Sequence, residues 1–174
     1  MRIAYISLGD GFPLVFASNI FGEANGYRIG WPQTREITDR LVGLGWRVVR
    51  YDVRGMGLSE RDVLDLSLEG RVRDLTAVVG HLGLDRFALG GLDVGAATAV
   101  AYAVQHPASV SHLILLSPWA SGAHYLYQNR YVGSLIHAAT RNASVNPTNG
   151  MSAIINAATT HRIRRRLPGS RRRA

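Results

Sequence analysis

The segment at residues 87–97 constrains the fold of this chain more than any other part of the sequence. It reads Phe-Ala-Leu-Gly-Gly-Leu-Asp-Val-Gly-Ala-Ala, an apolar strand that passes through a Gly-x-Asp-x-Gly turn into a helix of small residues. A strand that turns at once into a helix brings two backbones close together, so small residues are needed at Gly91 and Gly95. The residue at the apex of the turn, Asp93, is then expected to project above the carboxyl end of the strand.

Buried strands alternate with amphipathic helices along most of the chain. The alternation predicts an α/β protein with a mostly parallel sheet and helices on both faces. A segment of alternating apolar and polar residues at 2–8 is expected to be an edge strand, followed by a hairpin-type turn at 9–11. The expected buried strands are 14–17, 46–51, 86–89 and 113–116, and the expected helices are 34–44, 68–82 and 96–105.

Composition excludes several classes of protein. The chain has no cysteine, which excludes disulfides, thiolate metal sites and cysteine nucleophiles, and a cytoplasmic location is expected. No run of 18 apolar residues occurs, so no membrane span is predicted, and neither a metal nor a cofactor is predicted.

The net charge of +8 comes mainly from the end of the sequence, because seven of the 20 basic residues are arginines within 162–174. Such a segment could bind nucleic acid, but it has no aromatic side chain for base stacking. A disordered, solvated tail is therefore predicted, and nucleic-acid binding is not expected.

Two segments together resemble the α/β-hydrolase family. Residues 87–97 look like the nucleophile elbow of that family, with Asp93 at the position where a serine more often stands. Residues 51–59 are similar to the Asp-x-Arg-Gly-x-Gly-x-Ser loop that follows the fourth strand. The resemblance covers residues 1–122 and implies an incomplete α/β-hydrolase fold whose last strands are missing. Beyond it, 123–161 is expected to be a partial cap-like or irregular helical segment, and 162–174 an Arg-rich tail.

The resemblance also implies a set of site residues. Asp93 takes the nucleophile position, and the backbone N–H of Val94 is the first donor to an oxyanion. The second donor is expected near Asn19 and Ile20, where the family often has His-Gly. Two alternatives stay open: Asp93 as an N-cap of the helix, and residues 18–22 as an ordinary polar loop.

The remaining members of a catalytic triad are harder to place. No Asp or Glu follows Asp93 in this sequence, so the chain alone cannot complete a triad whose acid comes after the nucleophile. Among the six histidines, only His124 follows a strand at the appropriate edge of the sheet. It is the candidate base, and the alternative is an exposed loop histidine.

The function that the resemblance implies depends on the aspartate. Asp at the elbow resembles epoxide hydrolases and haloalkane dehalogenases, in which the carboxylate attacks carbon and a His-activated water releases the alkyl ester. Those families usually have Trp after the aspartate, whereas this chain has Val94, and its other residues look more like serine-type hydrolases.

Three functions therefore stay open. The first is hydrolysis of an ester or related small-molecule bond through Asp93, in a truncated chain with little or no activity, in effect a pseudoenzyme. The second is a non-catalytic α/β-hydrolase-like binding or interaction protein. The third is an enzyme like an epoxide hydrolase or haloalkane dehalogenase. Truncation would leave the strand at 113–116 as an unpaired apolar edge, which could bind a second chain or another copy.

Overall fold

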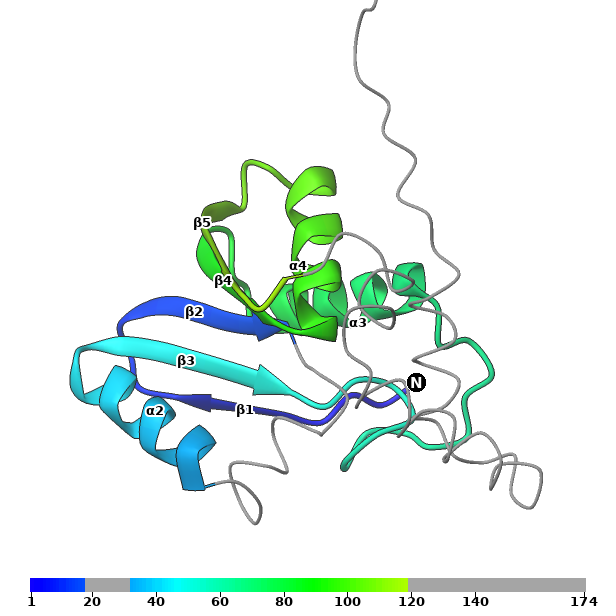
Figure 1. The fold of residues 1–174 in the computed structure, drawn as a ribbon, viewed down its shortest axis with the longest axis horizontal. Coiled ribbons are helices and arrows are strands. Elements are labelled where there is room, and N and C mark those ends of the chain that lie inside the picture. Colours follow the sequence, from blue (N-terminus) through cyan, green and yellow to red (C-terminus); the bar gives the residue numbers. More distant parts are fainter. Residues whose placement is uncertain (18–31, 119–174) are drawn as a thin grey trace, which may run out of the picture.

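The computed structural model describes residues 1–17 and 32–118, and a five-stranded sheet forms the centre of this part (Figure 1). One edge strand is antiparallel to its neighbour, and all other neighbouring strands are parallel to each other. This confirms the predicted α/β class with a mostly parallel sheet. Across the sheet, the strands are β1 (Tyr5–Leu8), β3 (Trp46–Tyr51), β2 (Phe12–Ala17), β4 (Phe87–Leu92) and β5 (Val110–Leu116).

The predicted hairpin after β1 is wrong. β1 and β2 are consecutive in sequence, but β3 lies between them in the sheet. The connection at residues 9–11 instead passes against the start of β3, where a Cβ on Gly9 would overlap the carbonyl oxygen of Trp46 and a Cβ on Gly11 that of Gly45. The Gly-Asp-Gly sequence thus permits a close crossing of two backbones, and it does not close a hairpin.

Helices cover both faces of the sheet, as predicted. In Figure 1, α3 (Leu68–His81) and α4 (Val94–Gln105) lie side by side, while α2 (Pro32–Gly43) lies apart from them beside β3. Successive strand residues face opposite sides of a sheet, and Val49 belongs to the core beneath α3 and α4. The next residue, Arg50, faces α2, and its Nε donates a hydrogen bond of 2.9 Å to the hydroxyl of Thr38.

The helix α2 packs through a different face than its apolar residues suggest. Ile37 of α2 and Leu44, which directly follows the helix, fit the predicted helical spacing, but their exposed fractions are 52% and 76%. The residue of α2 that is fully buried is the polar Thr38, whose hydroxyl accepts the hydrogen bond from the guanidinium of Arg50. That guanidinium also lies 4.2 Å from the centre of the Phe16 ring, so a cation stacked on an aromatic ring occupies the layer between helix and sheet.

The helix α3 follows its sequence pattern closely. Its N-cap, Ser67, accepts a hydrogen bond of 3.0 Å from the backbone N–H of Gly70, and Gly83 follows the helix with a φ of 62°. The predicted apolar stripe faces the sheet and is buried at Val72, Leu75, Val78 and Val79.

Several predictions concern residues outside the described ranges and stay predictions. They include the oxyanion-loop residues Asn19 and Ile20, the candidate base His124, the cap-like segment 123–161 and the Arg-rich tail 162–174. Within the described ranges, no helix combines the length and apolar character that crossing a bilayer requires.

Candidate active site

The candidate site lies where β4 ends and α4 begins, at the carboxyl edge of the parallel strands. Asp93, the residue between them, has φ 56° and ψ −118°. A Cβ on Gly91 would lie only 2.7 Å from the Cα of Ala96 and 2.9 Å from the Cβ of Ala99. Glycine is therefore required at position 91 for the strand and the helix to pass this closely, as the sequence predicts.

The side chain of Asp93 does not serve as a helix cap. It makes no capping hydrogen bond to α4, and the side chain is partly buried. The backbone of Asp93 holds the turn instead: its N–H donates to the carbonyl of Leu116 at 3.0 Å, and its carbonyl accepts from Ala96 at 3.1 Å. The backbone is thus anchored to β5 and α4 while the carboxylate is left for other contacts.

Val94 begins α4 and is almost completely buried, with an exposed fraction of 7%. The first N–H groups of a helix have no acceptor within the helix, and the helix dipole makes this end favourable for negative charge. The backbone N–H of Val94 is among these first groups, so it lies at an end of α4 that favours negative charge. Gly95 follows it in the first turn, and its carbonyl oxygen is 2.9 Å from the position that a Cβ on Gly91 would take.

The described histidines lie away from this edge. His81 ends α3, with its ring centre 5.6 Å from that of Tyr5, and His106 follows α4, with its ring centre 4.4 Å from that of Tyr102. Helices of a parallel α/β unit run opposite to its strands, so both helix ends lie at the amino edge of the sheet. His112 is near the start of β5 at the same edge. All three therefore lie at the edge of the sheet opposite to Asp93.

The loop after β3 has a structural role. The hydroxyl of Ser59 accepts a hydrogen bond of 2.9 Å from the N–H of Ala4 and donates one of 2.6 Å to the carbonyl of Asp52. A carboxylate oxygen of Asp52 also accepts a 2.9 Å hydrogen bond from the N–H of Leu58. The Asp-x-Arg-Gly-x-Gly-x-Ser segment therefore folds on itself and fixes the residues that lead into β1.

The arginine of this segment joins the loop to α3. Arg54 donates to both carboxylate oxygens of Asp74, at 2.9 Å from Nε and 2.7 Å from a terminal nitrogen, and to Asp65 at 3.1 Å. The side chains of Arg54 and Asp74 are only 8% and 1% exposed. The hydrogen bond to Asp74 is the main reason why the pKa of Arg54 is raised, although burial opposes it. Sequence reasoning missed this pair, since 20 positions separate the two residues and no periodicity links them.

A second arginine of α3, Arg71, is also buried, with an exposed fraction of 1%. Burial is the largest influence on its guanidinium and lowers its pKa, while the charges of Tyr51, Asp74 and Glu69 act in the opposite direction. Arg71 thus adds a positive charge to the layer under α3, close to the carboxylate of Asp74.

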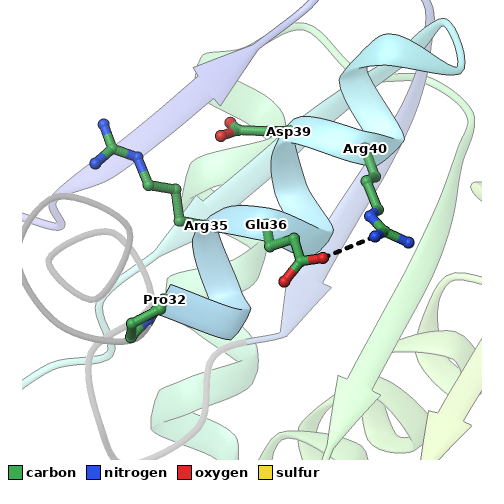
Figure 2. Close-up of a pocket in the computed structure, with 5 residues that line it drawn as sticks. All are labelled: Pro32, Arg35, Glu36, Asp39 and Arg40. Atoms are coloured by element: carbon green, nitrogen blue, oxygen red, sulfur yellow. Dashed lines mark ion pairs between the residues drawn. The ribbon is translucent and has the colours of Figure 1, made fainter.

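A surface hollow of about 550 Å³ lies on α2, and it is not part of the candidate site (Figure 2). Figure 2 shows its charged lining, in which Glu36 and Arg40 form an ion pair of 2.8 Å. No residue of the elbow lines it, and no group of three metal-ligating side chains occurs in the part of the chain that the structure describes. This hollow is therefore separate from the elbow at Asp93.

Comparison with known proteins agrees with this geometry. The sequence profile described as "alpha/beta hydrolase fold" matches residues 19–149. The soluble epoxide hydrolase of Corynebacterium sp. (strain C12) is 28% identical over 115 residues, covering 66% of this chain and 37% of that protein. Epoxide hydrolase 3 of Xenopus tropicalis is 31% identical over 144 residues, covering 76% of this chain and 37% of that protein.

The fold is also similar to that of solved hydrolases. An esterase from Exiguobacterium antarcticum superposes with a TM-score of 0.66 at 20% sequence identity, over 90% of this chain and 69% of that one. The chain spans about two fifths of the length of the two epoxide hydrolases, 37% of each. Sheet order, elbow and sequence profile agree, and the chain therefore belongs to the α/β-hydrolase family.

Proposed function

We propose that this chain carries the nucleophile of an epoxide-opening hydrolase, and that Asp93 is this nucleophile. The observation that carries the proposal is the conformation of Asp93, which turns sharply between β4 and α4 while its carboxylate caps no helical N–H. Two relatives named as epoxide hydrolases support an electrophilic carbon as the target. Attack on an ester is disfavoured, because a carboxylate that attacks an acyl group gives a reactive anhydride.

In the proposed first step, one Oδ of Asp93 attacks a ring carbon of the epoxide. A C–O ester bond forms, the ring C–O bond breaks, and its electron pair stays on the ring oxygen, which takes a proton from water. When water later attacks the ester carbonyl, the N–H of Val94 stabilises the oxyanion, and Asn19 or Ile20 supplies the second donor.

The second step is proposed to be slow in this chain. His124 is the candidate base that activates water for attack on the ester. The sequence has no carboxylate after Asp93 that could orient this histidine, and triad members act as a unit. With residues 1–174 by themselves, the ester is therefore expected to accumulate.

The substrate is proposed to be a small molecule, as the family suggests. The proposed steps need neither a metal nor an organic cofactor, because a carboxylate and water supply the chemistry. A cytoplasmic setting is proposed from the cysteine-free composition.

Intact-protein mass spectrometry with 1,2-epoxyhexane tests this function. We expect one adduct per chain in the wild type and none in Asp93→Asn, which keeps the size of the side chain but removes the anionic nucleophile. Asp85→Asn, at a surface position just before β4, is the matched control and is expected to behave like the wild type. If the wild type gives neither an adduct nor a diol, Asp93 is not a nucleophile.

A second candidate, a binding function, is favoured by the surface of β5. Leu113, Ile114 and Leu116 have exposed fractions of 40%, 42% and 51%, and among the described strands β5 pairs only with β4. Exposed apolar edge strands promote pairing with another chain. We propose self-association through this strand, which sedimentation velocity would detect as a dimer that Ile114→Arg converts to monomer. A wild type that stays monomeric at all concentrations would rule this out.

A further inference from the structure

Ser117 shares an uncommon backbone feature with Asp93. Among the described residues other than glycine, only these two have a positive φ, 56° for Asp93 and 51° for Ser117. Glycine occupies the five other positive-φ positions in the described part of the chain, because it adopts this conformation without steric cost. Strain of this kind tends to be retained at functional sites. At positions 93 and 117, therefore, a residue with a side chain is retained although glycine would relieve the backbone strain.

The residue after Ser117 makes its conformation still less common. Pro118 follows directly, and the position before a proline favours an extended backbone. The left-handed φ of Ser117 is therefore imposed by its surroundings at the end of β5. Glycine would adopt this turn more easily, so the turn alone does not account for a serine here.

The sheet places Ser117 beside Asp93. Leu92 of β4 is paired with Leu116 of β5, and the N–H of Asp93 donates to the carbonyl of Leu116 at 3.0 Å. Asp93 and Ser117 are the next residues of the two strands, and neighbouring strands lie about 4.8 Å apart. Ser117 is exposed, and its hydroxyl makes no hydrogen bond within the described part of the chain. A hydroxyl donor thus lies at the same sheet edge as the carboxylate, on the neighbouring strand.

We propose that Ser117 is a catalytic residue that donates a hydrogen bond to the oxygen released from the epoxide ring. The inference rests on the proposed function of Asp93. As the Asp93 Oδ–carbon bond forms and the ring C–O bond breaks, negative charge develops on the ring oxygen. The Ser117 hydroxyl stabilises this charge, and water supplies the proton that completes the alcohol. Hydrogen bonds to charged groups are stronger than those between neutral groups, so most of the benefit arises in the transition state.

Two electrophiles with the same six-carbon chain separate this role from a structural one. With 1,2-epoxyhexane the leaving oxygen needs a hydrogen-bond donor, whereas with 1-iodohexane the iodide departs as a stable anion and needs none. Adduct formation is followed by intact-protein mass spectrometry, and the rate for Asp93→Asn is subtracted in each case. We expect Ser117→Ala to slow the epoxide reaction about tenfold, the typical effect of one hydrogen bond to a developing charge, and to leave the iodide reaction unchanged.

Two further variants separate the loss of the Ser117 hydroxyl from any loss of folding stability. Ser117→Gly removes the hydroxyl and also relaxes the backbone, so it is expected to melt at a higher temperature than the wild type yet to lose epoxide reactivity like Ser117→Ala. Ser111→Ala removes a hydroxyl near the other end of β5 and is expected to leave both rates unchanged.

The results have distinct meanings. Equal loss of both reactions in Ser117→Ala, or an unchanged epoxide rate, would overturn the role of Ser117 alone. Failure of the wild type to react with either electrophile would overturn the proposed function of Asp93, and with it this inference.

Discussion

Removal of the Asp74 carboxylate should destabilise the chain more than removal of any exposed ion pair. Asp74 is 1% exposed and accepts three hydrogen bonds from Arg54: from the backbone N–H at 3.2 Å, from Nε at 2.9 Å and from a terminal nitrogen at 2.7 Å. In Asp74→Ala the guanidinium stays buried while its main partner is lost. Arg54 keeps only the contacts to the side chain and the carbonyl of Asp65, both at 3.1 Å.

The size of the effect follows from these contacts. Truncation of one partner of a buried ion pair typically costs 3–5 kcal/mol, and we expect about 3 kcal/mol here because Asp65 still compensates part of the charge. For a chain of this size that corresponds to a decrease of about 6–12 °C in Tm. The comparison variant is Arg73→Ala, which removes an ion pair between Arg73 and Asp65 whose side chains are 63% and 44% exposed. Exposed pairs contribute about 0–1 kcal/mol.

Thermal and urea unfolding of the full chain, followed by circular dichroism, measure both variants against the wild type. We expect a large loss of stability for Asp74→Ala and almost none for Arg73→Ala. Equal losses for the two variants would show that the buried pair is not what joins the loop after β3 to α3.

Three more predictions concern the same elements. Gly91→Ala should destabilise by about 1–3 kcal/mol in urea unfolding, since the new methyl group would overlap the start of α4, whereas Gly80→Ala, with no atom within 4 Å of the new Cβ, should stabilise α3 by about 0.4–1 kcal/mol. Asp93→Gly should melt at a higher temperature than the wild type, because φ 56° suits glycine, and should form no epoxide adduct. The hydrogen bonds from Ser67 hold the pKa of Asp65 below its ordinary 3.8. The contribution of the Asp65 carboxylate to folding stability is therefore complete above pH 3.8 and is lost as the pH falls through the lowered pKa. Acid unfolding should accordingly be less steep in Asp65→Asn.

The parts of the fold that follow from local physics could be predicted from the sequence. The stripe from Val72 to Val79 predicts α3 because its period matches a helix, and the run at β3 predicts a buried strand because no polar residue interrupts its centre. The turn at Asp93 could be predicted because a small residue at 91 is needed for the strand and the helix to pass.

The features that depend on long-range pairing could not be predicted. The residues 9–11 look like a hairpin, but which strand pairs with β1 is decided by β3, more than thirty residues later. The burial of Thr38 depends on Arg50, a charged residue in a strand whose pattern looks apolar. Ser117 gave no local signal, because its backbone conformation is imposed by the end of β5 and its relation to Asp93 exists only through the strand register.

The central claim is that the carboxylate of Asp93 is a nucleophile, and the position of the covalent adduct tests it most directly. The chain is treated with 1,2-epoxyhexane, digested, and analysed by fragmentation mass spectrometry of the peptide that spans the elbow. We predict a hydroxyhexyl ester on Asp93 and on no other carboxylate. An adduct spread over surface carboxylates, or located elsewhere with Asp93 unmodified, would contradict the account.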